Sequence, residues 1–120
     1  MKAYAYFQQR GGNVIGVAEV DIDDNMFSNI DSILERVYQS LQNIQGSWSF
    51  GPNFEGTSWE GEVNRDYRDN VVFLGEHPVN KRTGQKMGER SMMIGDLITF
   101  NGKTYEVDSI GFKEYVEEAA

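Results

Sequence analysis

The chain contains, from Asp96 to Val107, the stretch DLITFNGKTYEV, which predicts a β-hairpin. Asn101-Gly102 stands at its centre, and this pair favours a type I′ turn because both central positions of that turn need φ > 0. A two-residue turn at this place fixes the pairing of the strands. The predicted pairs are Phe100 with Lys103, Thr99 with Thr104, Ile98 with Tyr105, and Asp96 with Val107.

The alternation of side chains along this hairpin predicts which of its faces packs against the core. Successive residues of a strand point to opposite faces of a sheet. The apolar face, and therefore the expected core face, holds Ile98, Phe100, Tyr105 and Val107. The other face is expected to be mostly solvated and holds Leu97, Thr99, Thr104 and Glu106.

The segment 90–115 also resembles a known family. Its motifs read SMMIGDLI from Ser91 to Ile98 and YEVDSIGFKE from Tyr105 to Glu114. These motifs are similar to the closing segment of YodL-like domains, which are small domains of proteins encoded by conjugative elements and bacteriophages. Met93 stands where the family pattern has its second serine. The resemblance implies an origin in a mobile element and no established activity, so it assigns no catalytic residues.

Length and composition set further limits. A chain of 120 residues is predicted to form a single domain, residues 1–120, that buries ~65% of its unfolded surface. No apolar run approaches the ~18 residues of a membrane span, and the N-terminus turns polar at Gln8, too early for a signal peptide. Without cysteine there are no disulfides and no thiolate chemistry. We expect a cytoplasmic protein of the producing or infected bacterial cell, with no membrane association.

One amphipathic helix is predicted over about residues 29–45. Apolar residues recur there at i, i+3 and i+4 spacing, at Ile30, Ile33, Leu34, Val37, Tyr38, Leu41 and Ile44. Ser28 with Asp31 resembles a capping box, and Gly46 is the expected C-terminal stop. The polar positions Glu35 and Gln39 are expected to face solvent, so the helix should rest on a sheet by one side.

Two more strand-like runs precede the helix, Lys2 to Gln9 and Asn13 to Val20. A two-residue turn at Gly11-Gly12 would place Ala3, Ala5, Phe7, Gly16, Ala18 and Val20 on one face. The apolar run Val71 to Leu74 predicts a central strand. Together these elements predict an α+β fold, an antiparallel β-sheet of hairpins with one main helix packed on one face; the strand order is not determined.

The segment that follows the helix, residues 46–61, is rich in glycine and aromatic side chains, and we call it the aromatic loop. Its aromatic residues are Trp48, Phe50, Phe54 and Trp59. One interpretation is that the loop displays them to a partner, because tryptophan is favoured at binding hot spots. The alternative is that the loop folds its aromatic side chains back over the core.

Residues 77–90, which we call the basic loop, carry Lys81, Arg82 and Lys86. A loop of this length is unusual in a compact domain and is typically functional or mobile. The candidate partner-binding residues are therefore Trp48, Phe50, Phe54, Trp59, Lys81, Arg82 and Lys86.

The formal net charge is −8, and it is concentrated toward the two ends of the chain. An acidic chain is a poor general nucleic-acid binder because phosphates repel it. It is suited to a basic partner surface, including one that normally holds DNA or RNA. The alternative is that the charge serves only to keep a small protein soluble.

Residues that support catalysis or metal binding are sparse. His77 is the only histidine, and no Gly-x-Ser-x-Gly elbow is present; we expect an ordinary exposed position for it. The acidic stretch from Asp21 to Asn25 suggests calcium, but an EF-hand loop counted from Asp21 would have Met26 and Ser32 at its glycine and glutamate positions. Gly84 to Gly88 lacks Walker A spacing. We expect no catalytic residues, no metal and no cofactor.

These patterns favour a non-enzymatic protein that binds and inhibits or redirects a host protein, in an anti-defence or host-takeover role. The alternative is a single-stranded nucleic-acid-binding protein that uses the aromatic loop and the basic loop. An enzyme with an unrecognised site is a third hypothesis that no motif supports. An unpaired sheet edge would also allow a homodimer.

Overall fold

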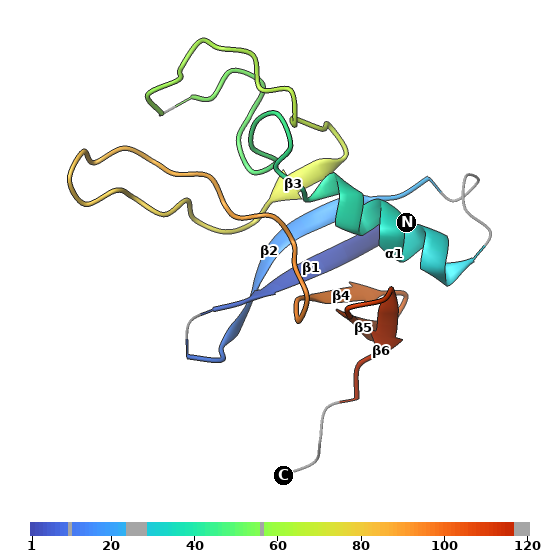
Figure 1. Cartoon of the computed structure of the whole chain (residues 1–120). Helices are drawn as coiled ribbons and strands as arrows, with labels where there is room; N and C mark the ends of the chain where they lie inside the picture. Colours follow the sequence, from blue (N-terminus) through green and yellow to red (C-terminus); the bar gives the residue numbers. More distant parts are fainter. Residues whose placement is uncertain (10, 24–28, 56, 117–120) are drawn as a thin grey trace.

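The computed structural model describes residues 1–9, 11–23, 29–55 and 57–116. It contains a six-stranded antiparallel sheet and one short helix (Figure 1), which agrees with the predicted α+β class. The strands are β1 (Lys2–Gln8), β2 (Val14–Asp21), β3 (Val71–Phe73), β4 (Leu97–Phe100), β5 (Lys103–Val107) and β6 (Phe112–Glu114), and the helix is α1 (Ile30–Ser40). Their order in the sheet is β3-β2-β1-β4-β5-β6.

The hairpin of β4 and β5 has the predicted register. Ile98 pairs with Tyr105 and Phe100 with Lys103, and Asn101 and Gly102 have φ values of 53° and 81°. The predicted core face is buried at Ile98, Phe100 and Val107, with Tyr105 partly buried. Leu97 was expected to be solvated, and this was wrong. It is buried because β4 lies inside the sheet, where Tyr6 of β1 and Glu106 of β5 flank it.

The N-terminal hairpin has a different register from the predicted one. Ala5 pairs with Ala18 as expected, but Tyr6 pairs with Gly16 and Phe7 with Ile15. Val17 is the extra residue of a β-bulge, and its carbonyl accepts the N–H of Leu74 at 2.8 Å. The connection between the strands is longer than a two-residue turn, so the pairs next to it are shifted by one residue from the predicted register. The bulge restores the predicted register from the pair of Ala5 and Ala18 onward. Val17 therefore occupies the core in place of the predicted Gly16, which is exposed.

The apolar run from Val71 to Leu74 forms an edge strand, and its prediction as a central strand was wrong. β3 pairs only with β2, and Val72 and Leu74 are exposed. The central positions belong to β1 and β4, which join the N-terminal and C-terminal hairpins. A continuous apolar run did not indicate a central strand here: Phe73 packs inward against Trp48 of the aromatic loop, while Val72 and Leu74 face solvent.

The helix α1 is shorter than predicted. Asn29 caps its N-terminus by accepting the N–H of Ser32 at 2.8 Å; the predicted cap, Ser28, lies outside the described residues. The helix ends at Ser40, and Ile44 is 73% exposed instead of continuing the apolar stripe. The reason is tertiary, because the Asp66 carboxylate binds the backbone after the helix, as described below.

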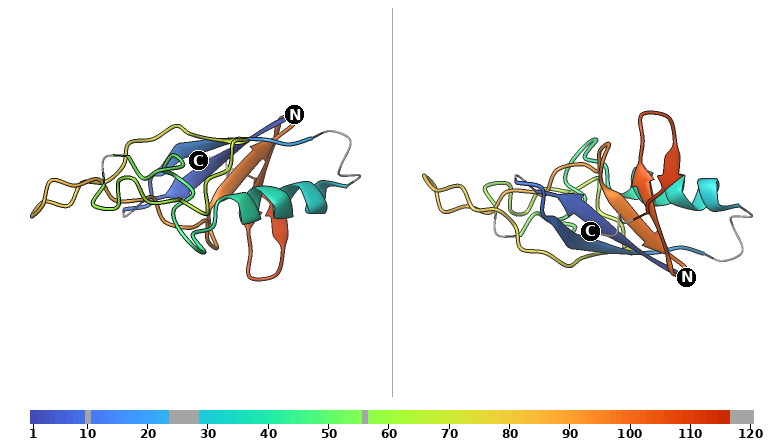
Figure 2. Two further views of the ribbon diagram at one scale, coloured as in Figure 1. Left: turned by 90° about the horizontal axis from the view of Figure 1, so that it is seen from above. Right: turned by 90° about the horizontal axis from the view of Figure 1, so that it is seen from below.

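The core lies between α1 and the curved sheet. The helix contributes Ile33, Leu34 and Val37, while Glu35 and Gln39 are exposed. Figure 2 shows β5 and β6 turned away from β1 and β2. Phe112 of β6 consequently meets Tyr38 of α1 edge to face, with 6.3 Å between ring centroids. The sheet thus encloses the apolar side of α1.

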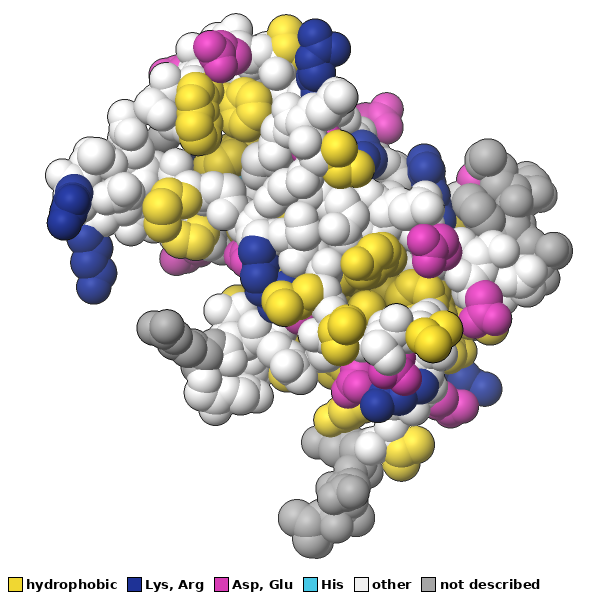
Figure 3. Space-filling view, in the orientation of Figure 1, with side chains coloured by type: hydrophobic (Ala, Val, Ile, Leu, Met, Phe, Trp, Pro, Cys, Tyr) yellow, Lys and Arg dark blue, Asp and Glu magenta, His cyan; other side chains and the backbone are white. Residues whose placement is uncertain are grey.

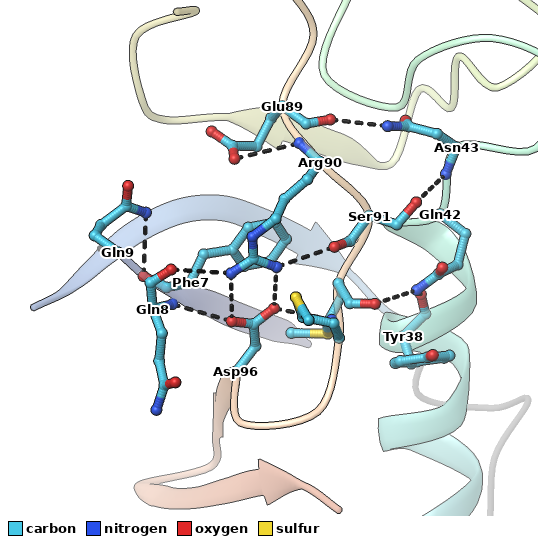
Figure 4. A network of polar contacts seen from close by, with 12 residues as sticks. Phe7, Gln8, Gln9, Tyr38, Gln42, Asn43, Glu89, Arg90, Ser91 and Asp96 are labelled. Atoms are coloured by element: carbon cyan, nitrogen blue, oxygen red, sulfur yellow. Dashed lines mark hydrogen bonds and ion pairs between the residues drawn. The ribbon is translucent and has the colours of Figure 1, made fainter. Parts of the chain in front are cut away.

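A buried ion pair joins the basic loop to the sheet. Asp96, only 1% exposed, accepts two bonds from the Arg90 guanidinium at 2.6 and 2.8 Å (Figure 4). It also accepts the backbone N–H groups of Gln8 and Met93, at 3.0 and 2.9 Å. Arg90 lies over the ring of Phe7 at 4.5 Å, and its bond to Asp96 raises the pKa of the guanidinium further.

Replacement of Asp96 tests this ion pair. Asp96→Asn should lower the free energy of unfolding by about 2–4 kcal/mol, because it removes the charge that holds Arg90 and presents an amide N–H to buried donors. The range is below that for a fully buried pair because Arg90 is partly exposed. The measurement is the urea midpoint. Glu106→Gln is the control: it weakens the exposed Lys113 pair, which solvent screens, so the midpoint should move little. Equal losses in both variants would contradict the assignment.

Candidate partner-binding cleft

The aromatic loop and the basic loop project together from the end of the sheet where β3 lies (Figure 1). They are far from each other in sequence, yet one hollow of about 380 Å³ is lined by Ser58 and Trp59 from the first and by Asn80, Thr83 and residues 85–88 from the second. Neither loop contains a regular helix or strand among its described residues. The shape of the site therefore depends on what holds each loop in place.

Asn64 holds the start of the aromatic loop. This side chain is buried, and its Nδ2 donates to the carbonyl groups of Ser47, Phe50 and Gly51 at 2.6, 3.1 and 3.0 Å. Its Oδ1 accepts the N–H of Ser47 at 3.0 Å. A Cβ at Gly46 would collide with the same Oδ1, so this turn needs glycine for close approach. The Asn64 carboxamide thus bonds to backbone groups that in a sheet would bond to a neighbouring strand.

Asp66 binds the segment that leads from α1 into the loop. Its Oδ2 accepts the backbone N–H groups of Ile44, Gln45 and Gly46 at 2.6, 2.9 and 2.7 Å. In a continuing helix these three N–H groups would instead donate to the carbonyl groups of residues 40–42. This contact accounts for the early end of α1.

The anchored loop buries three of the four aromatic residues that were predicted to face a partner. Trp48 is 3% exposed, donates its indole N–H to the carbonyl of Arg90 at 2.8 Å, and packs against the rings of Phe7 and Phe73. Phe50 and Phe54 are also buried. The expectation of display is therefore wrong for these three, which follow the alternative of folding back over the core.

Trp59 is the aromatic residue of this loop that lies at the surface. It is 57% exposed, and its ring meets the edge of Phe54 at 6.0 Å between centroids. Together with Phe50, Phe54 and Val63 it lines a second hollow of about 300 Å³ that opens beside the first. The two hollows adjoin each other, because Trp59 and Gly88 line both. We call them together the Trp59 cleft.

The basic loop is a ribbon closed by its own backbone. Val79 and Lys86 form a bridge, and the N–H of Met87 bonds to the carbonyl of Pro78 at 2.7 Å. At its far end, the N–H of Gly84 bonds to the carbonyl of Asn80 at 2.8 Å. Lys81, Arg82 and Lys86 are all exposed, and Figure 3 shows basic side chains at the tip of this projection. Lys86 lines the Trp59 cleft, whereas Lys81 and Arg82 lie beyond it in the tip.

His77 lies at the base of the ribbon and was wrongly expected at an ordinary exposed position. Its ring stacks on Phe50 at 4.0 Å and 6° and lies 4.4 Å from the ring of Phe73. Its Nε2 is 3.0 Å from the carbonyl oxygen of Ser49, which can only accept, so Nε2 carries the proton. Burial lowers the pKa of His77, and Lys86 adds to this, against the bond to Ser49. The histidine is thus a neutral link between the two loops.

The sequence did not identify every residue that shapes the cleft. Met87, 43% exposed, lines it, and Gly88 allows the ribbon to approach Ser47 and Phe50, because a Cβ there would collide with the Ser47 hydroxyl. Asn64 and Asp66 were missed as well, since isolated polar residues in a loop carry no signal of burial. The hollow beside the basic loop offers apolar contact, stacking, neutral polar groups and the ammonium group of Lys86, while the neighbouring hollow adds the carboxylate of Glu62.

Within residues 1–9, 11–23, 29–55 and 57–116, no group of three or more His, Cys, Asp or Glu side chains is placed to hold a metal ion. No helix in the same ranges has the length and apolarity to cross a bilayer. Asp24, part of the acidic stretch considered above, lies outside these ranges.

Comparison with known proteins gives no relative for this chain: it matches no family model, no curated protein and no solved structure. The motifs that resemble YodL-like domains lie in the segment from Ser91 to Asp96 and in β4, β5 and β6. The aspartate of that pattern is the buried Asp96. The family resemblance stays a prediction.

The anchoring role of Asn64 leads to a testable expectation. Asn64→Ala should lower the free energy of unfolding by at least about 2 kcal/mol, because it leaves several buried backbone groups without partners. Amide hydrogen exchange at Ser47 and Asp66 should accelerate selectively, since both N–H groups bond to Oδ1. Asn70→Ala, which removes one exposed bond to Asp21, should cost less than about 1 kcal/mol. Unchanged exchange at Ser47 would refute the role.

The lowered pKa of His77 predicts a pH dependence of stability. The pKa in the folded state lies below the usual 6.5, so between these two values the unfolded chain binds more protons. Stability should therefore be full above pH 6.5 and fall as the pH drops through this window. His77→Gln, which keeps an N–H donor but does not titrate there, should show a shallower loss. Urea midpoints from pH about 7.5 to about 5 measure it; parallel profiles for both proteins would rule out His77 as the cause.

Proposed function

We propose that the protein is a non-enzymatic binding protein of phage or mobile-element type, which docks on a host protein and inhibits or redirects it. The observation that carries this proposal is the Trp59 cleft, where a largely exposed tryptophan lies between two anchored loops. The resemblance of residues 90–115 to YodL-like domains supports the mobile-element part. The proposal places the protein in the cytoplasm of the bacterial cell.

The surface around the cleft has the composition of an interface. Trp59, Val63, Val79 and Met87 are all exposed, and Val63 reaches 71%. Figure 3 shows hydrophobic side chains gathered over the two projecting loops. Apolar groups clustered on the surface of a small protein mark interaction sites, and tryptophan is among the residues that contribute most at protein interfaces.

The anchoring of the loops also favours binding. Asn64, Asp66 and the His77 stack fix the walls of the cleft before any partner arrives. A preorganised surface loses less conformational entropy on association than a floppy loop does. A loop without regular secondary structure can therefore serve as a docking surface here.

Binding of single-stranded nucleic acid is the alternative, and one observation favours it: Trp59 and Lys86 line the same hollow. Such sites usually combine several stacking aromatics with a basic track. Trp48, Phe50 and Phe54 are buried, so the aromatic loop offers Trp59 alone. The net charge of −8 adds repulsion of phosphates. These observations place nucleic acid second.

Partner capture with a matched pair of variants tests the proposal. Immobilised protein is exposed to lysate of the host bacterium, and bound proteins are identified by mass spectrometry. Trp59→Ala should reduce recovery of a stoichiometric partner at least about tenfold, as expected for a hot-spot tryptophan. The control is Tyr115→Ala, which removes an exposed aromatic from the separate hollow beside Tyr6 and Val14.

The same experiment distinguishes the alternatives. Recovery that disappears after nuclease treatment, together with binding of a labelled oligo-dT that weakens steeply with salt, would replace the protein partner by nucleic acid. Equal loss of the partner in both variants would show that the cleft is not the docking surface. Trp48→Ala is unsuitable as a surface variant, because it removes a core residue.

A further inference from the structure

We propose that the Trp59 cleft receives an acidic segment of the partner that carries an apolar anchor residue. This inference rests on the proposed function and adds the chemistry of the segment. It concerns the part of the cleft between Trp59 and the basic loop, where Lys86 and Met87 lie together.

The charge of the ribbon favours an acidic partner segment. Among the described residues, no carboxylate forms an ion pair with Lys81, Arg82 or Lys86. The fourth cation near this loop, Arg90, is already neutralised by Asp96. Three exposed cations on one short ribbon are therefore available in a chain whose net charge is −8. Because surface charges interact over only about 8–10 Å in physiological salt, the ribbon presents a local basic surface.

The lining of the cleft adds the apolar anchor. Its hollow of about 380 Å³ contains Trp59, Met87 and Lys86 and no carboxylate, whereas Glu62 lines the neighbouring hollow. This volume lies at the small end of ligand sites, which suits one or two side chains of an extended segment. A tryptophan face and a flexible methionine accommodate an apolar side chain, while the cations meet the flanking carboxylates.

This assignment is compatible with the acidity of the rest of the chain. The remainder of this acidic chain would face a basic surface of the same partner, while the partner segment that enters the cleft is acidic. Electrostatic complementarity of this kind determines orientation and association rate more than affinity. Charge reversal goes further, because it brings like charges together across the interface, which opposes binding. Reversal of the ribbon charges should therefore weaken binding strongly without unfolding the protein, since all three side chains are exposed.

The test is a titration of the labelled protein with a synthetic hexapeptide, two acidic residues on each side of Leu-Phe, followed by nitrogen–proton correlation spectra. The indole N–H signal of Trp59 and the amides of the ribbon should shift. The indole of Trp48 is the internal control, because it is buried and bonded to Arg90. The same peptide with lysine in place of each acidic residue should bind at least about tenfold more weakly.

Variants complete the test. Lys81→Glu/Arg82→Glu/Lys86→Glu should weaken binding of the acidic hexapeptide at least about tenfold, whereas Lys103→Glu, at the exposed β4–β5 turn, should leave it unchanged. Unaltered binding by the triple variant, tighter binding of the lysine peptide, or tighter binding of oligo-dT than of the acidic peptide would each overturn the inference.

The outcome is separable from that of the proposed function. If Trp59→Ala loses the captured host protein but the triple variant retains it, docking at the cleft stands and the acidic segment is refuted. If the acidic peptide shifts Trp59 but no host protein depends on that residue, the chemistry of the cleft stands and the host-binding proposal fails. Loss of the same protein in both variants, with the peptide bound as expected, supports both.

Discussion

The carboxylate of Asp96 is the interaction on which the other parts of this structure depend. It lies where β4 begins, and it binds Arg90 at the end of the basic loop and the backbone of Gln8 at the end of β1. The end of the N-terminal strand and the segment from Arg90 to Asp96 near the C-terminus therefore meet at one buried group. Arg90 in turn covers Phe7, and its carbonyl accepts the indole of Trp48, so the same pair connects the sheet, the core and both loops.

In the loops, buried polar side chains bond to the backbone N–H and C=O groups that bonds between strands satisfy in the sheet. Asn64 and Asp66 satisfy the peptide groups of the segment between α1 and the aromatic loop. Asn43 donates to the carbonyl of Glu89 in the same manner (Figure 4). The Ser49 hydroxyl accepts the N–H of Glu89, and the two bonds attach the end of the basic loop. Buried peptide groups are costly unless they are bonded. A long segment without strands or helices can consequently be as well determined as the sheet.

This construction explains how a small acidic protein can offer a shaped binding surface. The aromatic loop adds Trp48 to the core of the sheet and α1, and the two loops pack on each other through His77, Phe50 and Gly88. The contact leaves Trp59 and Met87 exposed above buried aromatic rings. Exposed apolar and cationic side chains are therefore concentrated where the contacts between the loops end, and the proposed function assigns binding to this surface.

The sequence by itself determined the features that rest on local rules. The α+β class, the register of β4 and β5, and the apolar side of α1 all follow from turn chemistry and side-chain periodicity. Tertiary structure alone decided the edge position of β3, the bulge at Val17, the end of α1 at Ser40 and the burial of Trp48. Each depends on a partner distant in the chain, such as Asp66 for the helix end. Local pattern carries no information about such partners, because a polar residue in a loop looks the same whether it faces water or binds a buried peptide group.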